Sequence, residues 1–337
     1  MRSEKLVLVL VLLSWLTACT NEKPHLPEAK GLPSEMLVVM PSALLNTDIA
    51  DTVATIVDCD APGLGSSERI FRSMTIGERG YEKVYKAMHS QLKIELVPSQ
   101  KQPVLGVAYD VYATPQLQIL VRGGSLADLR SFLSQQREHI QRLVLDFQLD
   151  RYAAMLRQKY SKKVDADLQR LGYRVNVPTD IASTKKGKNF LWGSSNRGGE
   201  KDINFVFYTY PWNGEDIADT ARFVFKRDSV LKVNIPGSQP NQWMQTARGE
   251  QGMPVVWPSL RKVVGRQRLE VRGLWELHNG FMGGPFVSYV QVDSAARQVV
   301  VCEGFVFSPN SAKRDLLRSV EASLRTLKPL PVSEKAN

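Results

Sequence analysis

The first nineteen residues most strongly constrain what this chain can fold into, because they do not belong to the folded body. Arg2 and Lys5 precede an apolar run from Leu6 to Leu13, and small residues follow before Cys19. A charged start, a short apolar core and small residues before a cleavage site are typical of a secretory signal peptide. The run is also shorter than the roughly 20 apolar residues that a membrane-spanning helix needs. Residues 1–18 are therefore predicted to be a signal peptide that is removed on export.

Cys19 gives the exported chain a predicted membrane attachment. The sequence Leu16-Thr-Ala-Cys19 resembles the lipobox of bacterial lipoproteins, which implies that the Cys19 thiol is acylated. Each methylene of the acyl chains that enters the bilayer contributes about 0.8 kcal/mol to anchoring. Residues 20–33 are polar, contain three prolines and have no apolar periodicity, so residues 19–34 are predicted to form a lipidated tether. The sequence Thr20-Asn-Glu-Lys23 lacks the acidic run of surface-exported lipoproteins, which favours the periplasmic face of the outer membrane.

The charge and length of the chain limit its partners and its organisation. The chain has 44 Lys and Arg residues against 34 Asp and Glu residues, and its formal net charge is +10. Basic chains often bind nucleic acid, but export argues against nucleic acid here and favours an anionic envelope component or a protein partner. A solvated basic surface is the alternative interpretation. Without the signal, about 319 residues remain, which exceeds the roughly 250–300 residues of a single hydrophobic core and predicts two domains.

Strand-like and helix-like patterns occur in both halves of the chain. The predicted strands are 35–40, 69–75, 92–97, 104–112, 116–121, 173–178, 189–193, 203–210, 268–277, 286–292 and 299–307. The predicted helices are 49–57, 126–160 with a break near Leu149, 215–233 and 311–327. This arrangement predicts two α+β domains, residues 35–165 and 166–330, each an antiparallel sheet with packed helices. The similar order of elements in the two halves suggests a duplicated architecture, with the polar residues 161–169 as the connection.

The sequence contains no pattern that is typical of a metal or cofactor site. Its histidines are His25, His89, His139 and His278, and none has a second histidine or cysteine at ligand spacing. No metal and no cofactor are therefore predicted. Cys59 and Cys302 would meet an oxidising compartment and could form a disulfide, but Cys302 lies in a strand-like run where a buried free thiol is ordinary. We favour two free thiols.

Signatures of catalysis are equally weak, and no catalytic residues are predicted. The chain has no Gly-x-Ser-x-Gly elbow, and Ser183-Thr-Lys-Lys186 matches Ser-x-x-Lys by chance in a basic loop. Glu215, Asp216 and Asp219 cluster at the start of a predicted helix, where acids could perform acid–base chemistry or could complement the exposed amides. We favour the second role. An envelope hydrolase that acts on cell-wall or lipid material remains the alternative.

Several motifs in the second half resemble one family. They are Arg272-Gly-Leu-Trp-Glu276, Phe281-Met-Gly-Gly-Pro-Phe-Val-Ser288, Glu303-Gly-Phe-Val-Phe307, Lys313-Arg-Asp315, Arg227-Asp-Ser229, Ile235-Pro-Gly237 and, near the start, Met36-Leu-Val-Val-Met40. The chain resembles the DUF4837 family, a domain of unknown function in envelope lipoproteins of Bacteroidota, although Trp243 stands where the family pattern has tyrosine. The resemblance implies an envelope location and no known activity. Residues 173–327 are also similar to the PsbP/Mog1-like fold, which implies a binding or assembly module.

The motif from Phe281 to Phe286 has two interpretations. Aromatic residues beside a glycine turn are common in recognition sites, and the partner surface would then comprise Trp275, Phe281, Phe286, Arg272 and Arg268. Alternatively, both phenyl rings fix the loop to the core, and this is the interpretation that we favour. A set of basic residues could bind an anionic partner if the fold brings them together: Arg261, Lys262, Arg266, Arg268, Arg272, Lys185, Lys186 and Lys188.

Overall fold

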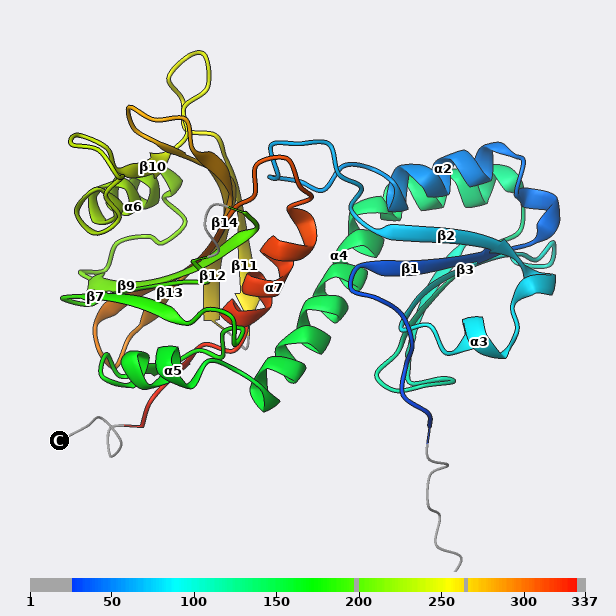
Figure 1. The fold of residues 1–337 in the computed structure, drawn as a ribbon. Coiled ribbons are helices and arrows are strands. Elements are labelled where there is room, and N and C mark those ends of the chain that lie inside the picture. The colour runs from blue at the N-terminus through cyan, green and yellow to red at the C-terminus, as the bar shows by residue number, and fades with distance from the viewer. Residues whose placement is uncertain (1–25, 197–199, 264–265, 332–337) are drawn as a thin grey trace, which may run out of the picture.

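The computed structural model describes residues 26–196, 200–263 and 266–331, and it consists of two domains joined by a long helix (Figure 1). Cys19 and the predicted signal peptide lie outside the described residues. The joining helix is α4 (Leu126–Gln158), and α7 (Arg314–Leu324) packs against it. None of the helices in the described ranges is long and apolar enough to cross a membrane.

The amino-terminal domain contains a five-stranded mixed sheet. Its strands lie in the order β2 (Arg72–Gly77), β1 (Glu35–Met40), β3 (Ser90–Leu96), β5 (Leu117–Gly123) and β4 (Val104–Tyr109). The pairs β1–β2, β1–β3 and β3–β5 are parallel, whereas β4–β5 is antiparallel. The α+β class is confirmed, but the prediction of an antiparallel sheet was wrong for this domain. Parallel neighbours need a crossover connection, and α2 (Asp48–Val57) lies within the segment that joins β1 to β2.

Helices α2 and α4 cover one face of this sheet. Strand β5 alternates between buried and half-buried residues, and its buried side chains belong to the core beneath the helices. Ser125 caps α4 by accepting a hydrogen bond from the backbone N–H of Asp128 at 3.1 Å. The 33 residues of α4 make a helix of about 50 Å. The helix therefore continues beyond the sheet to α7, and it has no break at Leu149.

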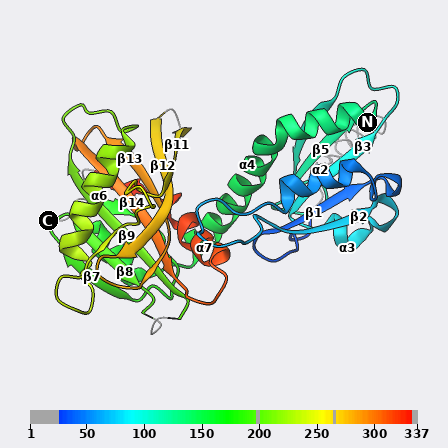
Figure 2. The ribbon, with the colours of Figure 1, turned by 90° about the horizontal axis from the view of Figure 1, so that it is seen from above.

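The carboxy-terminal domain is built on an eight-stranded antiparallel sheet. The order is β10 (Met244–Thr246), β12 (Arg266–Leu277), β13 (Gly283–Asp293), β14 (Gln298–Phe307), β9 (Asp202–Pro211), β8 (Phe190–Ser194) and β7 (Ser183–Gly187), and β11 (Val256–Val263) also pairs with β12. Figure 2 shows α6 (Thr220–Asn234) and α7 on opposite sides of this sheet. Successive residues of β14 accordingly alternate between two hydrophobic clusters, one beneath α6 and one beneath α7.

The remaining elements are short. They are η1 (Ser42–Leu44), η2 (Glu78–Gly80), α3 (Lys83–Lys86), α5 (Lys162–Gln169) and the pair β6 (Tyr173–Arg174) and β15 (Lys328–Pro329). The segment expected to be a polar connection is thus largely helix α5, with Ser161 as its cap. The two sheets differ in strand direction and order, so the expectation of a duplicated architecture was wrong.

The two domains are docked rather than merely tethered. The Glu68 carboxylate, from the segment before β2, accepts hydrogen bonds from the backbone N–H groups of Lys313 at 2.7 Å and Arg314 at 3.0 Å. No side chain of α7 itself caps its first turn, so the amino-terminal domain supplies that cap. Asp146 of α4 forms ion pairs with Arg261 and Arg325 of the other domain. One hydrophobic cluster runs through both domains.

Candidate functional site

Helix α6 is shorter than the sheet face that it covers, and each of its ends borders a hollow. The 15 residues of α6 span about 22 Å. The first hollow, of about 640 Å³, lies at the start of the helix, and the second, of about 340 Å³, lies beyond its end. The first hollow contains Glu215, Asp216 and Asp219, and the second contains Lys185 and Trp275, all of which the sequence singled out.

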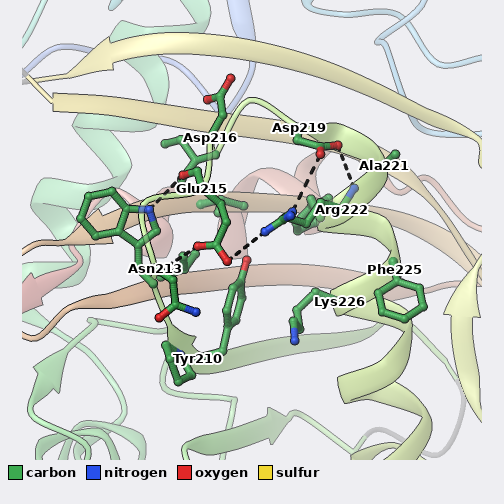
Figure 3. Close-up of a pocket in the computed structure, with 15 residues that line it drawn as sticks. Tyr210, Asn213, Glu215, Asp216, Asp219, Ala221, Arg222, Phe225 and Lys226 are labelled. Atoms are coloured by element: carbon green, nitrogen blue, oxygen red, sulfur yellow. Dashed lines mark hydrogen bonds and ion pairs between the residues drawn. The ribbon is translucent and has the colours of Figure 1, made fainter.

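The first hollow contains the acidic cluster (Figure 3). Glu215 accepts a hydrogen bond from the backbone N–H of Asn213 at 2.8 Å and forms an ion pair with Arg222 at 2.9 Å. The Asp219 carboxylate caps α6 by accepting from the backbone N–H of Arg222 at 2.9 Å. Aromatic side chains, including the exposed Phe225, form the walls.

The carboxylates of this hollow hold its loop and the first turn of α6. Hydrogen bonds from the backbone N–H groups of Asn213 and Glu215, together with Arg222, lower the pKa of Glu215. A general acid near neutral pH needs the opposite shift. Asp216 accepts from the backbone N–H of Ala218 at 2.9 Å. Asp219 complements the exposed amides of the helix start, as the sequence favoured, but α6 begins at Thr220 and not at Glu215, so Glu215 and Asp216 bond amides of the preceding loop instead.

The second hollow has an aromatic lining and a few polar groups. Its apolar side chains include Trp192, Trp275, Phe305, Phe307, Met244 and Met282. The indole N–H of Trp192 donates to the Asn204 side-chain oxygen at 2.9 Å, and that of Trp275 donates to the carbonyl of Val306 at 3.2 Å. Both indole groups are thus satisfied within the protein, and their ring faces remain to line the hollow.

The hairpin tip, residues 278–282 between β12 and β13, lies beside the second hollow and is fixed by hydrogen bonds. The backbone N–H of His278 donates to the carbonyl of Trp243 at 2.9 Å, and their rings stack with centroids 4.0 Å apart. The Gln242 amide donates to the carbonyl of Asn279 at 2.7 Å. At this tip Phe281 is fully exposed, at 109%, and Met282 is 41% exposed. The fold therefore presents an apolar pair on a fixed loop.

The structure corrects the predicted partner surface. Trp275 and Phe286 are buried, with exposures of 4% and 0%, because both side chains point to the face of the sheet that carries α6, where Trp275 lines the second hollow. Arg268 is also buried and pairs with Glu270. Arg272 pairs with Glu321 of α7. Of the five candidates Phe281 alone is an exposed side chain, so the favoured expectation that its ring is buried was wrong.

The basic residues do not gather into one patch. Arg261 lies on β11 and pairs with Asp146 at 2.7 Å. Lys186 lies on β7, towards the opposite edge of the sheet, and pairs with Asp167 at 2.7 Å. Lys185, on the same strand, donates to the carbonyl of Asn234 at 2.8 Å, while Lys188 and Lys262 are exposed. The side chain of Arg266 is not among those that the structure describes. The positions on β7 and β11 favour a solvated basic surface over an anion-binding cluster.

A buried ion pair that sequence reasoning did not identify fixes α6 on the sheet. Arg227 of α6 and Glu303 of β14 are both 0% exposed, and the guanidinium donates to both carboxylate oxygens at 2.7 and 2.8 Å. Ser288 donates a further hydrogen bond to the carboxylate at 2.6 Å. The guanidinium also lies 3.8 Å from the ring centre of Phe286. Since both hollows adjoin α6, this pair positions both of them.

Family comparisons divide the chain at the end of α4. Residues 160–326 match the family described as Domain of unknown function (DUF4837). The carboxy-terminal domain belongs to the DUF4837 family. Residues 29–157 match a different family, Domain of unknown function (DUF8532). The DUF4837 resemblance therefore does not extend to Met36–Met40, which lie in the second family's range and merely share an apolar strand composition.

Solved structures similar to the chain include two proteins of the PsbP/Mog1-like group to which the sequence pointed. Cyanobacterial PsbP from Synechocystis sp. PCC 6803 is 8% identical, with a TM-score of 0.31, and the match covers 47% of this chain and 86% of that one. A mutant of the protein Mog1 is 9% identical, with a TM-score of 0.30, and the match covers 49% of this chain and 94% of that one. No curated protein matches the chain.

Proposed function

We propose that this DUF4837-containing chain is a lipid-anchored protein of the cell envelope that faces the periplasm from the outer membrane. Its role is that of a non-catalytic binding or assembly module. The charged and apolar start of the chain and Cys19 support the anchor. The alternative of an envelope hydrolase depended on the acidic cluster, and those carboxylates hold a loop and a helix start instead.

The exposed ring of Phe281 is the observation that carries the binding role. A phenyl ring that is exposed to water on a fixed hairpin tip does not stabilise the fold. Its burial against a partner would contribute about 1.5–3 kcal/mol to the free energy of binding. The neighbouring hollow of about 340 Å³ has room for an apolar side chain of that partner. Aromatic anchors beside a pocket are typical of binding hot spots. The partner that we propose is therefore an envelope protein that covers the hairpin tip.

Replacing Phe281 by serine is expected to reduce recovery of the partner at least about tenfold, because the loss of the buried ring weakens the complex by at least about 1.4 kcal/mol. The measurement is quantitative mass spectrometry of proteins that co-purify after chemical cross-linking in intact envelopes. The matched control is Val233→Ser, since Val233 is 77% exposed on α6 and does not line either hollow. Equal partner recovery from the Phe281→Ser and Val233→Ser variants would exclude the hairpin tip as the binding surface.

Replacing Cys19 by alanine is expected to move the protein from the membrane pellet to the soluble fraction, because the acyl chains supply its attachment. The measurement is immunoblotting of fractions after a high-salt wash, which removes proteins held by charge alone. A variant that stayed in the washed pellet would show that lipid on Cys19 is not the anchor. Protease accessibility in intact cells then distinguishes the periplasmic face from the cell surface.

A further inference from the structure

A cleft of about 250 Å³ lies between the two domains, away from both ends of α6. Helix α4 contributes Gln148, Arg151, Tyr152 and Met155, and α7 contributes Arg318. The segment before β1 and His89, the residue before β3, complete its wall. Apolar groups, two guanidinium groups and the Asp315 carboxylate therefore line the same small space, and two further arginines, Arg314 and Arg72, pair with that carboxylate.

Arg318 is a desolvated cation without a carboxylate partner among the described residues. Its guanidinium donates to the hydroxyl of Ser34 and to the carbonyl of Ile70, each at 2.6 Å. The nearby Asp315 pairs with Arg314 and Arg72 and accepts a hydrogen bond from the Ser34 hydroxyl at 2.7 Å, so it reaches Arg318 only through Ser34. Burial and the neighbouring positive charge of Arg314 lower the pKa of Arg318 to about 9. A half-buried cation of this kind is stabilised by an anion that approaches it.

Arg151 places a second charge at the same cleft. It is half-buried, and within the described ranges it makes neither an ion pair nor a hydrogen bond. Its desolvation lowers the pKa of the guanidinium, although Glu28 acts in the opposite direction. Two guanidinium groups at one small cleft offer the planar, multiple donors that suit a carboxylate.

Gln148 supplies an unused acceptor. Its amide nitrogen donates to the carbonyl of Glu35 at 2.9 Å and to the hydroxyl of Ser90 at 3.3 Å. Its Oε1 atom is buried and has no hydrogen-bond partner in the described structure. An unpaired buried acceptor costs about 1–3 kcal/mol, and such groups are rare in native proteins. A ligand with an O–H or N–H group would satisfy it.

We propose that this interdomain cleft binds a small carboxylate that carries a short apolar chain and one hydrogen-bond donor. Arg151 and Arg318 hold the carboxylate, the Gln148 Oε1 atom accepts from the donor, and the apolar chain lies against Tyr152 and Met155. The ligand would touch helices of both domains. This site is independent of the Phe281 surface, and neither proposal depends on the other.

The test is isothermal titration of the mature chain, residues 20–337 made without lipid, with three probes. We expect 2-hydroxyhexanoate to bind about tenfold or more tightly than hexanoate, because only the first has the donor for Gln148, and we expect no binding of hexanol. Absence of heat from both acids at concentrations up to about 10 mM would overturn the proposal, as would equal binding of hexanol and hexanoate.

Two variants assign the contacts. Arg151→Met should weaken both acids about tenfold without altering the fold, since Arg151 makes no hydrogen bond to any other residue that the structure describes. Gln148→Met should remove the preference for the hydroxy acid, and the thermal melt of this variant checks that its core is intact. The control is Arg157→Met, an exposed position on the same helix outside the cleft. An unchanged affinity in Arg151→Met would show that the cleft is not the binding site.

Discussion

Replacing Glu303 by alanine is expected to lower the free energy of unfolding by about 3–5 kcal/mol, because it leaves the guanidinium of Arg227 buried without its anion. Both side chains are fully buried, so water cannot replace the lost carboxylate. The variant also removes the acceptor of the Ser288 hydroxyl. The measurement is urea denaturation followed by tryptophan fluorescence.

Two further variants separate charge burial from simple loss of volume. Glu250→Ala removes an exposed carboxylate of the same domain and should change stability by less than about 0.5 kcal/mol. The double variant Arg227→Met with Glu303→Met should be more stable than Glu303→Ala, because no buried charge remains unpaired. If Glu303→Ala unfolded at the same urea concentration as Glu250→Ala, the ion pair would contribute nothing to the attachment of α6.

Local apolar patterns were sufficient to predict most of the long elements. The run Glu35–Met40 is a strand at the predicted residues, and β14 lies within one residue of its predicted bounds, because apolar residues dominate both strands. The predicted helix over 126–160 is α4, since its apolar residues recur at helical spacing. These signals depend on neighbours along the chain, which the sequence shows directly.

The pairing of strands and the ion-pair partners of charged side chains depend on residues that are distant in sequence. The parallel arrangement of β1, β2 and β3 could not be predicted from the sequence, because an apolar strand has the same composition beside a parallel or an antiparallel neighbour. Helix α5 was mistaken for a polar connection because of its charges. In the structure Asp165 and Asp167 of α5 are buried and paired with Arg174 and Lys186, which come later in the chain.

The candidate site was predictable only in part, for the same reason. The acidic cluster was expected to complement the exposed amides of a helix start, and Asp219 does so as the cap of α6, although the helix begins five residues later than predicted. The hollows, the interdomain cleft and the Arg227–Glu303 pair arise where separate elements meet, so no local pattern indicates them. Phe281 and Phe286 belong to one motif, but only the second lies within β13, where the direction of the side chain is fixed.

Replacing Phe286 by alanine is expected to lower the free energy of unfolding by about 3–5 kcal/mol, as large aromatic deletions in cores do. Its ring is fully buried beneath α6 and packs against the guanidinium of Arg227, so the variant loses both apolar burial and a cation–π contact. Phe281→Ala is the matched control from the same motif and should change stability by less than about 0.5 kcal/mol, because its ring is surrounded by solvent. Thermal melts of the two variants beside the parent protein measure the difference. A Phe281→Ala melt shifted as far as that of Phe286→Ala would show that the hairpin tip supports the core and would remove it as a binding surface.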